Sequence, residues 1–282
     1  MRVVPGIDAL DPSVGRLFVV VGVFDGLHLG HEYLLRELAR GAAQRDAAPA
    51  VVTFDHHPEE VLLGKAPPLL CDPDERLARL EAAGVAVTVV QTFDVALRET
   101  PFEAFVGRIA DPVDLAGFLM TPESAFGYQR AGTPDTVAAL GQAMGYAVEV
   151  VPQFTLAGEP VRSSDIRAAI ASGDLARAEQ LLGRPYSIAG ELVGELAGRA
   201  QHGLARLRTV LPAALPPAGT YLVDRERLVS GPTELERIDA VVDDHGQVWV
   251  PGGSTGTIRV RFMGSTRPEA PAGHRRGPNG RG

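Results

Sequence analysis

Residues 19–40 read VVVGVFDGLHLGHEYLLRELAR, a β-branched apolar run joined to an amphipathic run by a turn rich in glycine and histidine. The first run is short and continuous, which is typical of a strand buried on both faces of a parallel sheet. After the turn, apolar residues return at the spacing of one helical face, at Leu34, Leu35, Leu38 and Ala42. The stretch therefore predicts a strand, a turn and a helix that begins near His31.

The same alternation of strands and helices continues to about residue 185. Further strand-like runs lie at residues 48–55, 85–93, 114–120 and 146–154. Helical patterns accompany them at residues 72–84, 100–109, 133–145 and 163–183. Such alternation implies βαβ units with right-handed crossovers and a parallel sheet. We therefore expect an α/β fold with a Rossmann-like open parallel sheet over residues 1–186.

The pattern changes after residue 187. Short strand-like runs separated by turn signals follow at residues 187–196, 219–230, 238–252 and 255–264, and no long helix is evident. This succession of short strands and turns predicts a small β-barrel domain over residues 187–266. Residues 267–282 are rich in proline, glycine and arginine, so we expect a disordered tail there.

The composition narrows the class of protein. Hydrophobic residues make up 45% of the 282 residues and charged residues 22%, close to an ordinary soluble domain. A net charge of −8 without a broad basic footprint argues against a nucleic-acid partner. No apolar run reaches the roughly 18 residues of a membrane span, so we expect no membrane partner and a cytoplasmic location. Cys71 is the one cysteine, which excludes an intrachain disulfide and a zinc site built from cysteines. The sequence does not specify the oligomeric state.

The glycine- and histidine-rich turn is placed to hold phosphate. In an open parallel sheet, ligands bind beyond the carboxyl ends of the strands, and a helix N-terminus there favours an anion. Gly22, Gly26 and Gly30 allow the backbone to approach a ligand closely. His28 and His31 add directed donors that stabilise charge as it develops on a departing pyrophosphate. The turn therefore predicts a triphosphate site.

Other interpretations of the turn fit less well. A zinc site would need further ligands, and His28 and His31 together with His56 and His57 have no common zinc spacing, so we predict no protein-bound metal. The glycines lie four apart, which does not match a G-x-G-x-x-G dinucleotide turn. An ordinary loop that happens to contain histidine and glycine is the remaining alternative.

Four motifs, in the same order, resemble the bacterial FAD synthetase family, the bifunctional riboflavin kinase/FMN adenylyltransferases. They are GVFDGLHLGH at 22–31, VVTFDHHPEEVL at 51–62, SAFGYQRAGT at 124–133 and the segment 161–190 that begins VRSSDIR. The His-x-Gly-His core is shared by the wider nucleotidylyltransferase superfamily. The preceding Phe24, Asp25 and Gly26 narrow the resemblance to this family, and it covers about residues 17–190.

The resemblance implies a reaction in which ATP and FMN, with Mg²⁺, give FAD and pyrophosphate. It implies catalytic roles for His28, His31, Ser164 and Arg167. The nucleotide would be bound by Gly22, Val23, Phe24, Asp25, Gly26, His28, His31, Ser163, Ser164 and Arg167. The flavin would be bound by Phe54, His57, Pro58, Glu123 and Phe126. Each assignment has a structural alternative: Phe54 as plain core, the two serines as helix caps, and Arg167 as a solvated helix residue.

The chain also departs from the family pattern. Glu123 and Ser124 stand where the family has Asp or Asn and an aromatic residue, and Arg162 and His56 replace a serine and a proline. Most of these changes lie on the flavin side, so the resemblance supports ATP as donor more firmly than FMN as acceptor. Two alternatives therefore stay open: another phosphorylated or modified-flavin acceptor, and a non-catalytic protein that binds flavin nucleotide.

The second domain departs further from the resemblance. The family's Pro-Thr-Ala-Asn motif, which holds magnesium and phosphate in the kinase, is absent, and Pro232-Thr233 comes too late and precedes Glu234. Arg259 aligns loosely with the family's catalytic glutamate, and an arginine cannot serve as the general base that a kinase needs. The family's long C-terminal helix is missing as well. We therefore expect that the barrel has lost riboflavin kinase activity.

Overall fold

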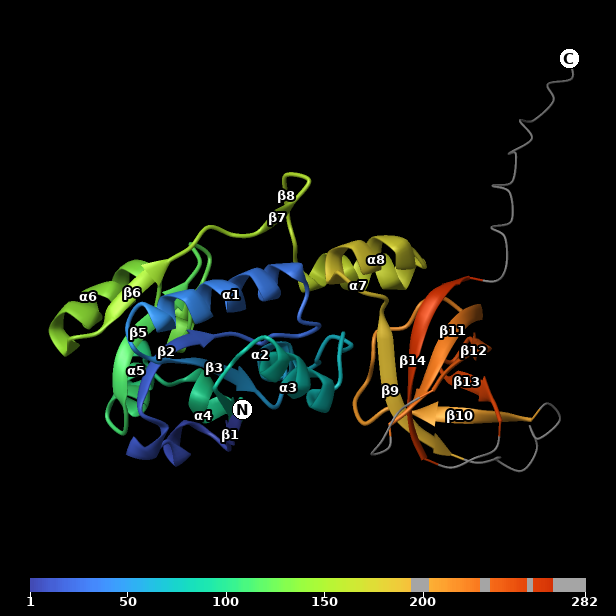
Figure 1. Cartoon of the computed structure of the whole chain (residues 1–282), viewed down its shortest axis with the longest axis horizontal. Helices are drawn as coiled ribbons and strands as arrows, with labels where there is room; N and C mark the ends of the chain where they lie inside the picture. Colours follow the sequence, from blue (N-terminus) through green and yellow to red (C-terminus); the bar gives the residue numbers. More distant parts are fainter. Residues whose placement is uncertain (194–202, 229–233, 253–255, 266–282) are drawn as a thin grey trace, which may run out of the picture.

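The computed structural model describes residues 1–193, 203–228, 234–252 and 256–265. Within these ranges the chain forms two units in succession, a parallel sheet covered by helices and a closed β-barrel (Figure 1). This arrangement confirms the predicted fold class. The tail predicted at residues 267–282 lies outside the described residues.

The sheet has six parallel strands in the order β1-β4-β3-β2-β5-β6. The strands are β1 (Arg2–Val4), β2 (Arg16–Val21), β3 (Ala48–Phe54), β4 (Val87–Gln91), β5 (Asp114–Met120) and β6 (Ala147–Val150). Val19 of β2 lies opposite Ala50 of β3 and Phe118 of β5, so the run that opens the motif occupies the middle of the sheet. The edge strand β1 was not predicted, because a three-residue run carries no readable period.

The helices follow the sequence patterns closely. They are α1 (Leu29–Ala43), α2 (Pro58–Leu63), α3 (Pro73–Ala82), α4 (Val95–Arg98), α5 (Phe102–Ala110), α6 (Pro134–Met144), α7 (Ser163–Ser172) and α8 (Leu175–Leu182). Short elements complete the unit: η1 (Ile7–Ala9), η2 (Pro12–Val14), η3 (Tyr128–Arg130) and the hairpin β7 (Thr155–Leu156) and β8 (Glu159–Pro160). α2 and α4 were not predicted, since helices of 6 and 4 residues are too short for a helical period to emerge.

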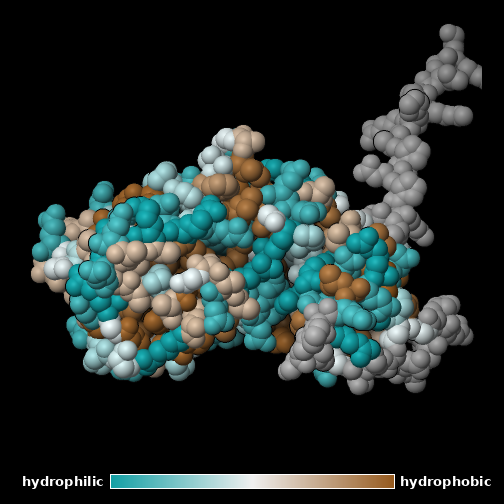
Figure 2. Space-filling model, in the orientation of Figure 1, coloured by the Kyte–Doolittle hydropathy of each residue, from teal (hydrophilic) through white to brown (hydrophobic). Residues whose placement is uncertain are grey.

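Alternate residues of β2 enter two different cores. Phe18 and Val20 pack in the cluster that contains Leu35 and Leu38 of α1. Leu17 and Val19 pack in the cluster on the other face, which includes residues of α5. Burial on both faces explains why β2 is a continuous apolar run rather than an alternating one. On the face shown in Figure 2, hydrophilic side chains cover α1 and apolar side chains gather below it.

The second unit is a closed antiparallel barrel in the order β10-β13-β12-β11-β14-β9. Its strands are β9 (Ser187–Val193), β10 (Leu204–Arg208), β11 (Gly219–Arg227), β12 (Leu235–Val242), β13 (Val248–Pro251) and β14 (Gly256–Ser265). Apolar side chains such as Val223, Val250 and Val260 fill the interior and are fully buried. β10 was not predicted, because the strand is short and arginines alternate with its apolar residues.

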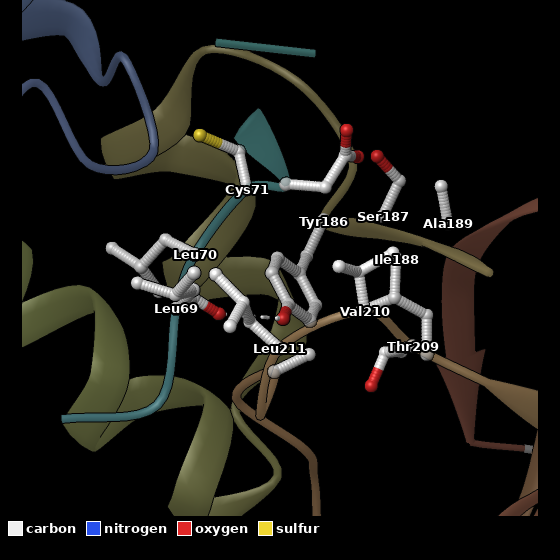
Figure 3. Close-up of a pocket in the computed structure, with 12 residues that line it drawn as sticks. Leu69, Leu70, Cys71, Tyr186, Ser187, Ile188, Ala189, Thr209, Val210 and Leu211 are labelled. Carbon is white, nitrogen blue, oxygen red and sulfur yellow. Dashed lines mark hydrogen bonds between the residues drawn. The ribbon is translucent and has the colours of Figure 1, made fainter. Parts of the chain in front are cut away.

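The two units are packed against each other. Helices α7 and α8 share one apolar core with the barrel strands. Leu69 forms a parallel bridge with Ala213, and the Tyr186 hydroxyl donates to the Ala214 carbonyl at 2.6 Å. Figure 3 shows Tyr186 between residues 69–71 of the first unit and residues 209–211 of the second, beside a pocket of only about 20 Å³. The barrel therefore lies directly against the segment that leads into α3.

Candidate active site

The turn after β2 ends in a histidine that caps helix α1. We call residues 22–28 the signature turn. His28 is the N-cap residue, and its Nδ1 accepts a hydrogen bond from the His31 backbone N–H at 3.3 Å. A neutral His28 ring then carries its proton on Nε2, where it can donate to a ligand. The helix begins at Leu29, two residues before the predicted start, because the histidine side chain itself supplies the cap.

The two histidine rings stack at the entrance to the helix. Their centroids lie 3.7 Å apart with an interplanar angle of 17°. A Cβ on Gly30 would lie 3.1 Å from the His28 ring, a tight contact that would require the ring to shift slightly. His31 Nδ1 is buried and has no hydrogen-bond partner in the described part of the chain. The capping ring and the unpartnered ring nitrogen thus lie together at the N-terminus of α1, where an anion is favoured.

Both rings are neutral before a ligand arrives. Burial, together with Arg184 and Arg167, lowers the pKa of His28 to about 4. Burial, the neighbouring His28 and Arg184 hold the pKa of His31 well below its ordinary value. The rings therefore act as N–H donors, and a bound polyphosphate would raise both pKa values by its negative charge.

This depressed pKa makes stability depend on pH. The pKa of His28 falls from 6.5 to about 4 on folding, so between these values the unfolded chain binds more protons. The free energy of unfolding therefore stays at its full value above pH 6.5 and decreases as the pH falls from 6.5 through about 4. His28 accounts for about 3 kcal/mol of this decrease. Urea unfolding at a series of pH values should show a smaller loss for His28→Asn than for the wild type. Equal losses would mean that His28 is not held neutral.

The signature turn is anchored from inside the protein. The buried Asp25 carboxylate accepts hydrogen bonds from the backbone N–H groups of Leu70 at 2.9 Å and Cys71 at 3.3 Å. Phe24 and Leu27 have φ angles of +54° and +36°, a left-handed conformation that side chains adopt only when their surroundings impose it. The Asp25 side chain is therefore part of the support for the turn.

Glycine is required at the centre of this turn. Gly26 has φ +78°, and a Cβ there would lie 2.8 Å from Leu70 Cβ. Its N–H donates to the Cys71 sulfur at 3.2 Å. Burial raises the pKa of the Cys71 thiol to about 12, so this sulfur is a neutral packing group rather than a nucleophile.

Helix α7 brings the second predicted phosphate element to the same turn. Arg167 donates from Nη2 to Asp25 Oδ2 at 2.6 Å and from Nε to the Pro68 carbonyl at 2.9 Å, so it is not a solvated helix residue. The Ser163 hydroxyl donates to the Asp25 carbonyl at 3.2 Å. The N-cap of α7 is Arg162, so the alternative in which Ser163 and Ser164 cap the helix is wrong. Ser164 lies in the exposed first turn, with its hydroxyl bonded to Asp165.

The five predicted flavin residues line one cavity of about 730 Å³. Its walls are largely aromatic and aliphatic: Phe54 lies edge-on to Phe93, and Phe126 lies beside Phe105. Phe54 is only 8% exposed, so it is both a core residue and a wall of the cavity. The cavity also reaches the signature turn, because Gly22 and Val23 belong to its lining. The flavin candidates on the same lining are Phe54, His57, Pro58, Glu123 and Phe126.

Two of the departures from the family pattern contact each other. Arg162 Nη2 lies 3.2 Å from Glu123 Oε1, and Arg130 donates to the Glu123 carbonyl at 3.2 Å. Gln129 and Arg130 on the cavity wall both have positive φ angles, +53° and +59°. Two of the altered residues, Glu123 on the cavity lining and Arg162 beside it, thus form one ion pair.

Sequence reasoning missed three charged residues that support the signature turn. Arg184 donates to the carbonyls of Gly26 at 2.6 Å and Leu27 at 3.1 Å. Arg76 donates to the Val23 carbonyl at 3.3 Å, and the buried Glu75 lies 3.7 Å from Arg184. These residues are separated from the signature turn by roughly 50 to 160 positions in the sequence, and no local motif identifies them. Only the fold brings them close to the turn.

Comparisons with known proteins agree with the geometry. The sequence pattern of the FAD synthetase family matches residues 12–165. A bifunctional riboflavin kinase/FMN adenylyltransferase of Pseudomonas fluorescens is 30% identical over 94% of this chain and 80% of its own length. The protein of the same name from Haemophilus influenzae is 31% identical over 71% of this chain and 66% of its own length.

A solved structure shows the same fold at lower identity. The protein titled a macrolide-efflux protein from Streptococcus pneumoniae matches with a TM-score of 0.79 and 21% identity, over 97% of this chain and 93% of its own. At that identity the likeness concerns the fold alone. None of the described helices is long and apolar enough to cross a membrane. On the family pattern and the Pseudomonas fluorescens relative, the chain belongs to the FAD synthetase family.

Proposed function

We propose that this site transfers the adenylyl group of ATP to FMN and releases FAD and pyrophosphate. The observation that carries the proposal is the lining of one cavity, which brings the aromatic rings of Phe54 and Phe126 together with Gly22 and Val23 at the start of the signature turn. A flat ring system in this cavity would therefore lie beside the turn that we expect to hold the polyphosphate. Membership of the FAD synthetase family makes the chain an ATP-dependent nucleotidyltransferase.

The reaction needs no protein nucleophile. A phosphate oxygen of FMN attacks the α-phosphorus of ATP, a new P–O bond forms, and the bond to the β-phosphate breaks to release pyrophosphate. ATP enters with Mg²⁺ as its substrate complex. His28 and His31 offer N–H donors at the N-terminus of α1, where the leaving phosphates gain charge. Arg167, with Ser163 and Ser164 at the start of α7, completes the phosphate-binding set.

The acceptor side is suited to a flavin. Phe54 and Phe126 present aromatic faces and edges, which favour contact with a tricyclic ring. His57 and Pro58 begin helix α2 at the cavity rim, and Glu123 belongs to its lining. Aromatic and aliphatic walls with a few polar groups are typical of cofactor-sized sites.

One assay tests the proposal. The purified protein is mixed with FMN, ATP and Mg²⁺, and FAD and pyrophosphate are measured together; equal amounts of both are expected. A second candidate, transfer to another phosphorylated or modified-flavin acceptor, rests on the Glu123–Arg162 pair. Pyrophosphate release only with such an acceptor would favour it. Flavin binding without turnover would instead indicate a non-catalytic flavin-nucleotide-binding protein.

The barrel is expected to have no riboflavin kinase activity. Arg259, the residue loosely aligned with the kinase glutamate, points toward α3 and lies 3.6 Å from Asp72. Pro232 and Thr233, the late Pro-Thr pair, lie outside the described residues. Incubation with riboflavin, ATP and Mg²⁺ should yield no FMN by chromatography, with a bifunctional relative as the positive control. Clear FMN formation would contradict this expectation.

The cytoplasmic location also stays a prediction.

A further inference from the structure

An arginine of the barrel faces two carboxylates of the nucleotide-binding unit. Arg259 Nη2, on β14, lies 3.6 Å from Asp72 Oδ2 and 3.6 Å from Glu75 Oε2 at the start of α3. Neither carboxylate oxygen has a hydrogen-bond partner in the described part of the chain. The Glu75 side chain is only 4% exposed, so its charge depends on nearby cations rather than on water.

The same glutamate connects to the signature turn. Glu75 Oε1 accepts a hydrogen bond from Arg79 Nε at 2.6 Å and lies 3.7 Å from Arg184 Nη2. Arg184 in turn donates to the carbonyls of Gly26 and Leu27, immediately before His28. A chain of alternating charges thus runs from the barrel to the backbone that precedes the capping histidine.

The backbone at the end of this chain needs support. Leu27 has a φ of +36°, a conformation that is unfavourable for a residue with a side chain. The Arg184 hydrogen bonds hold it there, and Glu75 holds the Arg184 guanidinium against the cost of its burial. Without Arg259, the buried Glu75 carboxylate would have only Arg79 and Arg184 beside it. Its side chain would then move toward solvent or toward these two arginines.

We propose that Arg259 of the barrel is a positioning residue for adenylyl transfer, acting through Glu75 and Arg184 on the signature turn. The inference rests on the proposed function in one respect, that ATP phosphates bind at this turn. It gives the barrel a role in the first unit's reaction, independent of any kinase activity of its own. Arg259 touches neither ATP nor FMN in this role.

The test compares Arg259→Gln with Arg259→Lys and with a matched control, Arg261→Gln. Arg261 lies two residues further along the same outward face of β14, and its ion pair with Glu226 stays within the barrel. Arg259→Gln should weaken binding of a non-hydrolysable ATP analogue, and raise the KM for ATP, by about fivefold. The KM for FMN should stay unchanged, Arg259→Lys should restore most of the affinity, and Arg261→Gln should behave like the wild type.

The analogue titration separates this inference from the proposed function. If the wild type forms no FAD, the proposed function fails, but calorimetric binding of the ATP analogue still tests Arg259. Wild-type affinity in Arg259→Gln, or an equal loss in Arg261→Gln, would overturn the inference. A double-mutant cycle tests whether Arg259 acts through Glu75. In a Glu75→Gln background, Arg259→Gln should weaken binding of the ATP analogue little further. Fully additive losses would exclude Glu75 as the intermediary.

Discussion

Replacing His28 by Asn should lower kcat for FAD formation about a hundredfold to a thousandfold, the loss typical of removing one preorganised donor to developing charge. The neutral ring offers its Nε2–H to the phosphates, and asparagine cannot place a donor at the same point. Asparagine is a good N-cap residue, so the cap of α1 should survive. The measurement is steady-state kinetics with ATP varied at saturating FMN.

The comparison variants make this result specific. His31→Asn should give a loss of similar size, because its unpartnered Nδ1 belongs to the same stacked pair. His245→Asn, on an exposed barrel turn, should have no effect. The KM for FMN should change little in all three variants. A His28 variant that keeps full kcat, or that loses FMN affinity alone, would contradict the phosphate role.

Replacing Arg167 by Met should lower both stability and activity. The variant leaves the Asp25 carboxylate, whose side chain is 4% exposed, without its cation, and breaking a buried ion pair in this way costs about 3 kcal/mol. Catalytic efficiency should also fall about a hundredfold, because a fixed cation is lost beside the phosphate site. Urea unfolding and FAD formation measure the two losses separately.

A double variant separates the two roles of Arg167. In Asp25→Asn with Arg167→Met, no buried charge is left unpaired, and the asparagine oxygen can still accept from the Leu70 N–H. Stability should therefore recover in part, while activity should not. Recovery of activity together with stability would show that Arg167 only supports the fold.

Long patterns in the sequence predicted most of the fold. The strand β2 and helix α1 were evident because a buried parallel strand and an amphipathic helix have distinct periods. β1, α2 and α4 were missed because each is too short to show a period, and their places are set by neighbours. In the barrel, β10 was missed because arginines interrupt its short apolar run.

The site was predicted less completely than the fold. His28 and His31 were found because they lie in one short motif, and the resemblance to the family singled out the five cavity residues in two further segments. Sequence could not show that the Asp25 side chain turns inward to Leu70 and Arg167. The roles of Arg184 and Glu75 could not be predicted either, because their contacts depend on tertiary structure alone.

The firmly held signature turn has a thermodynamic consequence. Its backbone is fixed by hydrogen bonds from Arg184 and Arg76 and by the bonds of Asp25, before any ligand is present. Nucleotide binding there orders little additional chain, so the entropic cost of association falls mainly on ATP itself. If the turn binds ATP as proposed, the affinity for the triphosphate is set by a shape that folding has already fixed rather than by closure around the ligand.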